Sequence, residues 1–204
     1  MKARLAVSIG LILVMLFCIC ACAEEMGGTQ ESEPFVFRNG IMWGDSMRRV
    51  IAVENSDDYK EDNNGNWHYI GYESATVSNF TSRVLAYAFA DNQLMCIWYE
   101  FPDTFPEESR QYLTAALESK YGEPVQTDTD YETIVQLLKL ISPMESELTD
   151  IHSWYLDDGT RIAFFAMHDY YDICYLFYFD EKHMFETFGA DANDATGSYN
   201  TFGL

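Results

Sequence analysis

The feature that most constrains the fold of this chain is a series of strand-like segments joined by very short turns. Residues 83–90 and 94–101 are rich in β-branched and aromatic side chains, and only three residues separate them. Three more such segments, residues 153–156, 160–167 and 172–179, are joined by Asp157-Asp158-Gly159 and by a four-residue turn. Because no helix separates the strands within either group, they form hairpins, and the sheet is predicted to be antiparallel.

Three segments with helical periodicity accompany these strands. Ser46, or Asp45 before it, can cap a helix that runs to about Glu54. Capping boxes open two further helices, and these boxes are Thr104-Phe105-Pro106-Glu107 and Thr129-Asp130-Tyr131-Glu132. The polar residues 55–66 are predicted to be a loop. The order of these elements predicts an α+β fold, with an antiparallel sheet and two or three helices packed on one face.

The period of two in the strands predicts which side chains share a face of the sheet. We expect one apolar set to be buried together. Its members are Met95, Ile97, Tyr99 and Phe101 from one strand and Ile173, Tyr175, Phe177 and Phe179 from the last strand. Trp98 and Tyr178 then fall on the opposite face. If the helices leave that face open, these two side chains are candidates for a glycan-stacking or protein-docking surface; if helices cover it, they belong to the core.

The N-terminus has the three parts of a secretory signal peptide. Lys2 and Arg4 precede an uncharged apolar run over residues 5–20, and Ala21-Cys22-Ala23 supplies the small residues of a cleavage site. The apolar run is too short to span a bilayer. We therefore predict a signal peptide (1–23), a flexible acidic leader (24–34), a single α+β domain (35–186) and a flexible tail (187–204). The protein is expected to be secreted or extracytoplasmic.

The cysteines leave two alternatives open. Ile19-Cys20-Ala21-Cys22 also resembles a lipoprotein box, in which Cys22 would be acylated and the protein would be lipid-anchored to the cell membrane. After residue 23 only Cys96 and Cys174 remain. Export permits a disulfide between them, and two buried thiols are the alternative.

The acidic composition excludes some classes of partner. The chain has 12 Lys and Arg against 33 Asp and Glu, a formal net charge of −21 at pH 7. Nucleic acids and anionic membrane surfaces require basic patches, so neither is an expected partner, and membrane contact is expected only if Cys22 is lipidated. The 4 histidines are dispersed and no Cys-x-x-Cys occurs in the domain, so neither a metal site nor a cofactor is predicted.

The opening of the domain resembles that of a known group. Residues 37–50 read Phe-Arg-Asn-Gly-Ile-Met-Trp-Gly-Asp-Ser-Met-Arg-Arg-Val. This order is similar to the start of BamE/SmpA-type lipoproteins and of many small secreted proteins of Gram-positive bacteria. Tyr87-Ala88-Phe89 through Leu94, and Lys120-Tyr121-Gly122-Glu123-Pro124, also resemble the latter proteins. The resemblance covers residues 35–125 and implies an extracytoplasmic interaction module with no catalytic residues to transfer.

Gly44-Asp45-Ser46 is the strongest candidate for a catalytic motif. It resembles the nucleophile block of GDSL-type serine hydrolases, and Asp180-Glu181-Lys182-His183 matches the Asp-x-x-His of those enzymes. The resemblance implies Ser46 as nucleophile, His183 as base and Asp180 as the residue that orients it. The Gly-x-Asn-Asp block that supplies the oxyanion hole is missing between the motifs. We therefore predict a non-catalytic binding module for a protein or glycan of the cell envelope, with this hydrolase as the alternative.

Cleavage is expected after Ala23, which leaves Glu24 as the mature N-terminus. Intact-mass spectrometry of the exported protein tests this expectation, because removal of residues 1–23 lowers the mass by a defined amount. A diacylglyceryl group on Cys22 would contradict it and would support the lipid-anchored alternative.

Overall fold

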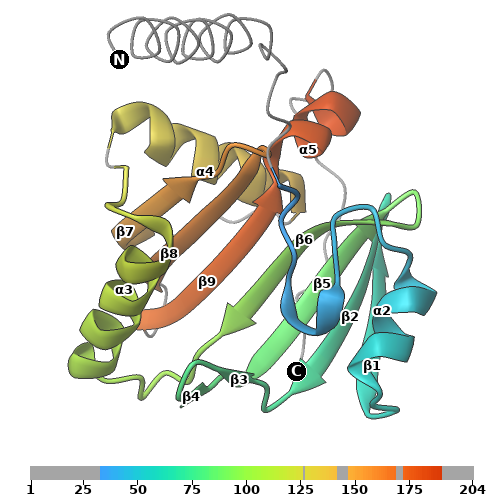
Figure 1. Ribbon diagram of the computed structural model, residues 1–204, viewed down its shortest axis with the longest axis horizontal. Helices are drawn as coiled ribbons and strands as arrows, with labels where there is room; N and C mark the ends of the chain where they lie inside the picture. Colours follow the sequence, from blue (N-terminus) through green and yellow to red (C-terminus); the bar gives the residue numbers. More distant parts are fainter. Residues whose placement is uncertain (1–32, 126, 142–146, 169–171, 190–204) are drawn as a thin grey trace, which may run out of the picture. The chain divides into compact units, whose positions relative to one another are not determined.

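The computed structural model describes residues 33–125, 127–141, 147–168 and 172–189. An antiparallel sheet of seven strands organises this part of the chain (Figure 1). The strands are β1 (Tyr59–Asn64), β2 (Trp67–Glu73), β3 (Thr76–Val77), β4 (Phe80–Thr81), β5 (Val84–Ala90), β6 (Gln93–Glu100), β7 (Glu147–Tyr155), β8 (Thr160–His168) and β9 (Asp172–Asp180). The helices are α2 (Met47–Glu54), α3 (Glu107–Tyr121), α4 (Asp128–Ile141) and α5 (Glu181–Phe188), with a short 3₁₀ turn η1 (Arg38–Gly40). The predicted antiparallel α+β architecture is confirmed.

The large sheet consists of two meanders that meet at its centre. Its strand order is β1-β2-β5-β6-β9-β8-β7, so the last strand of each meander pairs with the other, β6 with β9. The ribbon β3-β4 forms a separate two-stranded sheet. Asp91 and Asn92 make the two-residue turn between β5 and β6, and both have positive φ angles, 49° and 60°. These are the angles that a type I′ hairpin turn requires.

Both faces of the sheet are buried. The first face lies beneath α2, α3 and an N-terminal segment, residues 34–45, that we call the strap. Figure 1 shows the strap, in blue, crossing the sheet between these two helices. The second face lies beneath α4 and α5. The expectation of helices on one face is therefore wrong. The cause is visible in β8, where Ile162-Ala163-Phe164-Phe165 sends apolar side chains to both faces, and exposing either face would forfeit about 25 cal/mol for each Å² left in water.

The expected pairing of apolar sets is also wrong, for two physical reasons. Ile97 lies opposite Tyr178 and Tyr99 opposite Leu176, so the first face combines Ile97 with the even-numbered residues of β9. The odd-numbered residues Tyr175, Phe177 and Phe179 line the second face. Because β9 is apolar on both faces, its pattern does not specify the register. In addition, a bulge near the start of β6 places Met95 on the second face beside Cys96.

Helix starts follow the predicted chemistry but not always the predicted residue. Ser46 caps α2 as expected, accepting a hydrogen bond from the Arg49 amide at 3.3 Å. The predicted box at residues 104–107 is not used, because Pro106 occupies the cap position of α3 and makes no side-chain cap bond. At α4 the cap lies two residues before the predicted one: Thr127 Oγ1 accepts from the Asp130 amide at 3.2 Å.

The elements that were not predicted include β1 and α5. β1 lies inside the polar segment 55–66, and it was missed because an edge strand pairs on one side only and can keep polar side chains. α5 runs to Phe188, two residues past the predicted domain end. The predicted signal peptide, Cys22 and residues 190–204 of the predicted tail lie outside the described residues. None of the described helices is long and apolar enough to cross a membrane.

Substitutions on either face of the sheet are expected to be equally severe. Ile97→Ala opens a cavity on the first face and should lower the free energy of unfolding by about 2–5 kcal/mol, and Phe177→Ala should cost about 3–5 kcal/mol on the second. Urea denaturation followed by circular dichroism measures both values. Lys60→Ala on the polar edge strand is the control and should change stability by less than about 0.5 kcal/mol. A loss below about 1 kcal/mol for Phe177→Ala would show that the second face is not a core.

Candidate functional site

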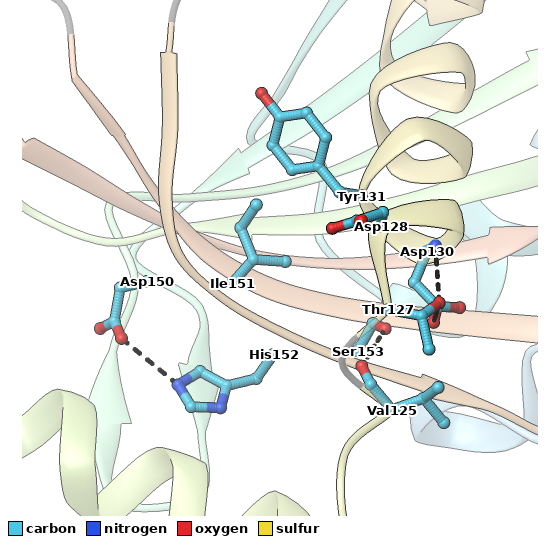
Figure 2. A pocket seen from close by; sticks show the side chains of 9 residues that line it. All are labelled: Val125, Thr127, Asp128, Asp130, Tyr131, Asp150, Ile151, His152 and Ser153. Carbon is cyan, nitrogen blue, oxygen red and sulfur yellow. Dashed lines mark hydrogen bonds and ion pairs between the residues drawn. The ribbon is translucent and has the colours of Figure 1, made fainter.

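An open groove of about 360 Å³ lies beside the edge strand β7, where the chain enters α4 (Figure 2). One wall is formed by residues 150–153 of β7. The other wall is formed by Val125, Thr127 and the first turn of α4, from which Asp128, Asp130 and Tyr131 reach the groove. Its volume is at the lower end of the range for pockets that hold a small molecule or a single side chain.

The groove exists because the edge of β7 is only partly paired. Val125 donates its amide to the Ser153 carbonyl at 2.7 Å, and the Ser153 hydroxyl donates to the Val125 carbonyl at 3.0 Å. Further back along β7 the strand bulges between Thr149 and His152, where Asp150 has a φ of 53°. The bulge turns this part of β7 away from the segment that leads into α4. The pairing that joins Val125 to Ser153 therefore does not continue, and space remains between β7 and the start of α4.

The first turn of α4 is held in place by a buried cation. Arg161 on β8 is 6% exposed; its Nη1 bonds Asp130 Oδ1 at 2.7 Å, and its Nε bonds Glu181 at the start of α5. The guanidinium also lies 5.1 Å from the Tyr155 ring centroid. Desolvation acts to raise the pKa of the Asp130 carboxyl, but hydrogen bonds from Thr127 and Arg161 outweigh it and lower the pKa below its ordinary value. One arginine thus fixes both helices that cover the second face.

The groove is negative overall. It presents the carboxylates of Asp128, Asp130 and Asp150, whereas Arg161 is shared between Asp130 and Glu181. The N-terminus of α4 contributes about +0.5 of an elementary charge, which does not neutralise the surplus. Asp128 is exposed and makes no ion pair with any described residue. Asp150 is about half exposed and lies 3.4 Å from His152 Nε2.

Apolar side chains are exposed at this edge as well. The described residues include six large apolar side chains that are exposed, and two of them, Val125 (42%) and Tyr131 (42%), line the groove. Ile151, which is half-buried, extends from the β7 wall toward α4 in Figure 2. The His152 ring stacks on Trp154 with centroids 6.5 Å apart, and its buried Nδ1 has no hydrogen-bond partner among the described residues. The groove therefore combines an acidic rim with an apolar lining.

The structure does not assemble the serine hydrolase site. Asp180 and His183 do lie together, with Oδ2 and Nδ1 2.6 Å apart, but this pair caps α5, because Asp180 Oδ1 also accepts the His183 amide. Ser46 caps α2 on the first face, whereas α5 packs Met184 into the second core. The nucleophile and the base therefore belong to helices on opposite faces of the sheet. Both motifs are helix caps, and their short polar side chains serve backbone amides.

The other residues selected from the sequence lie in the cores. Trp98 is half-buried on the second face and stacks on Phe177 at 5.5 Å, whereas Tyr178 is buried on the first face beneath the strap. The two do not form a common docking surface. Cys96 and Cys174 belong to opposite cores, so the sheet separates their thiols and the possible disulfide is not formed. Burial raises the pKa of the Cys96 thiol well above its usual value.

Within the described ranges, no group of three or more His, Cys, Asp and Glu side chains is arranged to hold a metal ion. Comparisons with known protein families, with curated proteins and with solved structures find no match to this chain. The groove itself was not predicted. Asp130 and Tyr131 entered the sequence analysis only as parts of a capping box, and no local pattern indicated Asp150 or His152.

The Asp130→Asn variant tests how much the ion pairs of Arg161 with Asp130 and Glu181 stabilise the fold. The variant is expected to lower the free energy of unfolding by about 1–2 kcal/mol at pH 7, because Arg161 loses one of two charged acceptors. The pKa of Asp130 is lowered in the folded state, so its stabilising contribution is present above the ordinary value of 3.8 and is lost as pH falls through the folded-state pKa. The difference between variant and wild type should therefore shrink below about pH 4.

Urea denaturation at several pH values from neutral to strongly acidic checks this dependence. Asp128→Asn is the matched control, because it removes a carboxylate from the same turn without removing an ion pair. A stability difference for Asp130→Asn that is independent of pH would contradict the argument.

Proposed function

We propose that this protein is a non-catalytic interaction module that works outside the cytoplasm and binds a basic segment of a partner protein in the groove beside β7. The observation that carries the proposal is the combination found there: an acidic rim around exposed apolar side chains. Tyr131 and Ile151 offer contact area for an aliphatic stem, and Asp128 and Asp150 offer charge for its head. Lysine and arginine side chains have this amphipathic chemistry.

Charge complementarity favours a basic protein segment over a neutral glycan. With a net charge of −21, the chain attracts cationic groups over distances of about a Debye length, and opposite charge on a partner speeds productive encounter. A sugar would instead require a planar array of hydrogen-bonding side chains or an uncovered aromatic face. Trp98 and Tyr178 do not supply such a face, because Phe177 stacks on one and the strap covers the other. Ser46 and Asp180 each cap a helix, and these helices pack on opposite faces of the sheet, which favours a module without catalysis.

A short peptide tests the proposal directly. The probe is Ac-Gly-Val-Arg-Val-Gly-amide, and the same peptide with citrulline in place of arginine is a neutral control of equal shape. We expect the arginine peptide to bind, with amide shifts mapping to residues 125–131 and 150–153 in NMR spectra. Replacing both Asp128 and Asp150 by Asn should weaken binding by about tenfold or more, which corresponds to about 1.4 kcal/mol. Asparagine suits position 150, because it tolerates the positive φ found there.

The matched control is Glu61→Gln, which removes one carboxylate from β1 at the opposite edge of the sheet. It should leave the affinity unchanged. Equal binding of the citrulline peptide would overturn the electrostatic argument. If chitotetraose shifts the amide signals of the same groove residues and the arginine peptide does not, the partner is a glycan and not a protein.

A further inference from the structure

The strap covers the first face of the sheet with a small hairpin. Val36 pairs with Met42, the Phe37 amide donates to the Ile41 carbonyl at 2.7 Å, and the tip, residues 38–40, turns through Asn39 at a φ of 57°. Phe37 packs inward against Tyr87, Tyr99 and Tyr178, with ring centroids 5.2–6.3 Å away. The outer side, with Val36 and Met42, is exposed. The tip thus lies at the surface and is not a strand of the seven-stranded sheet.

Beneath the tip lies a buried carboxylate in a ring of tyrosines. The Glu54 side chain is only 7% exposed, and its Oε1 accepts a hydrogen bond from the Tyr87 hydroxyl at 2.5 Å. Glu54 is the last residue of α2, where the negative end of the helix dipole adds to the carboxylate charge. Burial, reinforced by the Glu54 carboxylate, raises the pKa of Tyr72 to about 12. A carboxylate in these surroundings requires a cation.

Arg38 at the tip of the strap supplies that cation. Its guanidinium also hydrogen-bonds the Tyr99 side chain, and although burial acts to lower the pKa of Arg38, Glu54 and Tyr99 together raise it. The pairing of Arg38 with Glu54 itself is loose. It reaches Glu54 only through Nε, at 3.3 Å, and to the same Oε1 that Tyr87 already occupies. Charge-assisted bonds of this kind usually measure about 2.7–2.9 Å. Arg38 Nη1 is buried with no hydrogen-bond partner among the described residues, and so is the hydroxyl of Tyr72, which is 6% exposed. The site therefore keeps two polar groups without hydrogen-bond partners among the described residues, Arg38 Nη1 and the Tyr72 hydroxyl, close to the Glu54 carboxylate.

We propose that Glu54 and the tyrosines around it form a binding site for a small guanidinium or ammonium group, which the strap occupies with Arg38 in the unliganded protein. A free guanidinium can pair with both oxygens of Glu54 in the fork geometry that Arg38 does not reach. The Tyr87 hydroxyl already donates to Glu54, and the Tyr72 hydroxyl, which has no hydrogen-bond partner among the described residues, can accept a hydrogen bond from the bound cation. Binding displaces the Arg38 tip into solvent. This site is independent of the groove beside β7.

Ethylguanidinium is the probe, and isothermal titration of the full chain is the measurement. Because Arg38 competes for the site, Arg38→Ala should bind the probe about tenfold more tightly than the wild type if the strap occupies the site about nine-tenths of the time. Arg48→Ala, which removes an exposed arginine from α2, is the matched control and should behave like the wild type. Neutral ethylurea should not bind. Equal affinity of Arg38→Ala and wild type, or binding of ethylurea, would overturn the proposal.

Two further variants in the Arg38→Ala background locate the site. Glu54→Gln should abolish binding, and Tyr72→Phe, which removes one hydroxyl and leaves the ring, should weaken it several-fold. If the Glu54→Gln protein does not fold, the Tyr72→Phe variant is the deciding test. An affinity for ethylguanidinium equal to that of the Arg38→Ala protein would then contradict the proposed site. In the wild type, hydrogen exchange of the Phe37 amide should accelerate when ethylguanidinium binds, because that amide closes the hairpin at the tip. Binding without faster exchange would refute displacement of the strap.

Discussion

The constraint on which the rest of this structure depends is a central sheet that is apolar on both faces. β6 and β9 pair at the junction of two meanders, and the side chains around them alternate between two separate hydrophobic cores. Neither face tolerates water, so each must find a cover. The first core is closed by α2, α3 and the strap, and the second by α4 and α5. The packing of each described α-helix against one of the two faces follows from this requirement, and the strap covers the first face together with α2 and α3.

The two edges of the sheet are protected from pairing with other chains in different ways, and the difference creates the groove. β1 carries Lys60, Glu61 and Asp62, and charged side chains of this kind discourage a further strand from adding. β7 is instead covered in part by Val125 and distorted by a bulge at Asp150. The bulge interrupts the cover and leaves a concave surface. A device that protects an edge can in this way also provide a place to bind.

Short polar side chains explain why the sequence contains motifs that resemble catalytic ones. Ser46 and Asp180 each precede a helix and accept a hydrogen bond from a backbone amide three residues later. An N-cap and a nucleophile or its orienting acid use the same residue types, because both need a compact oxygen near a turn. The distinction lies in what surrounds the oxygen in space. Here α2 and α5 pack on opposite faces of the sheet, and each motif caps its own helix.

The sequence by itself determined the α+β class, the antiparallel pairing, the hairpin turns and most helix positions, because these depend on local periodicity, capping and turn residues. It did not determine the face on which each helix packs, the register of β9 against β6, or the edge strand β1. Those features depend on which apolar surfaces meet, and a strand that is apolar on both sides carries no mark of its partner. The groove beside β7 and the Glu54 site were decided by tertiary structure alone. Each joins residues of different elements, such as Asp130 with Arg161 or Arg38 with Glu54, and nothing in the local sequence around them indicates the contact.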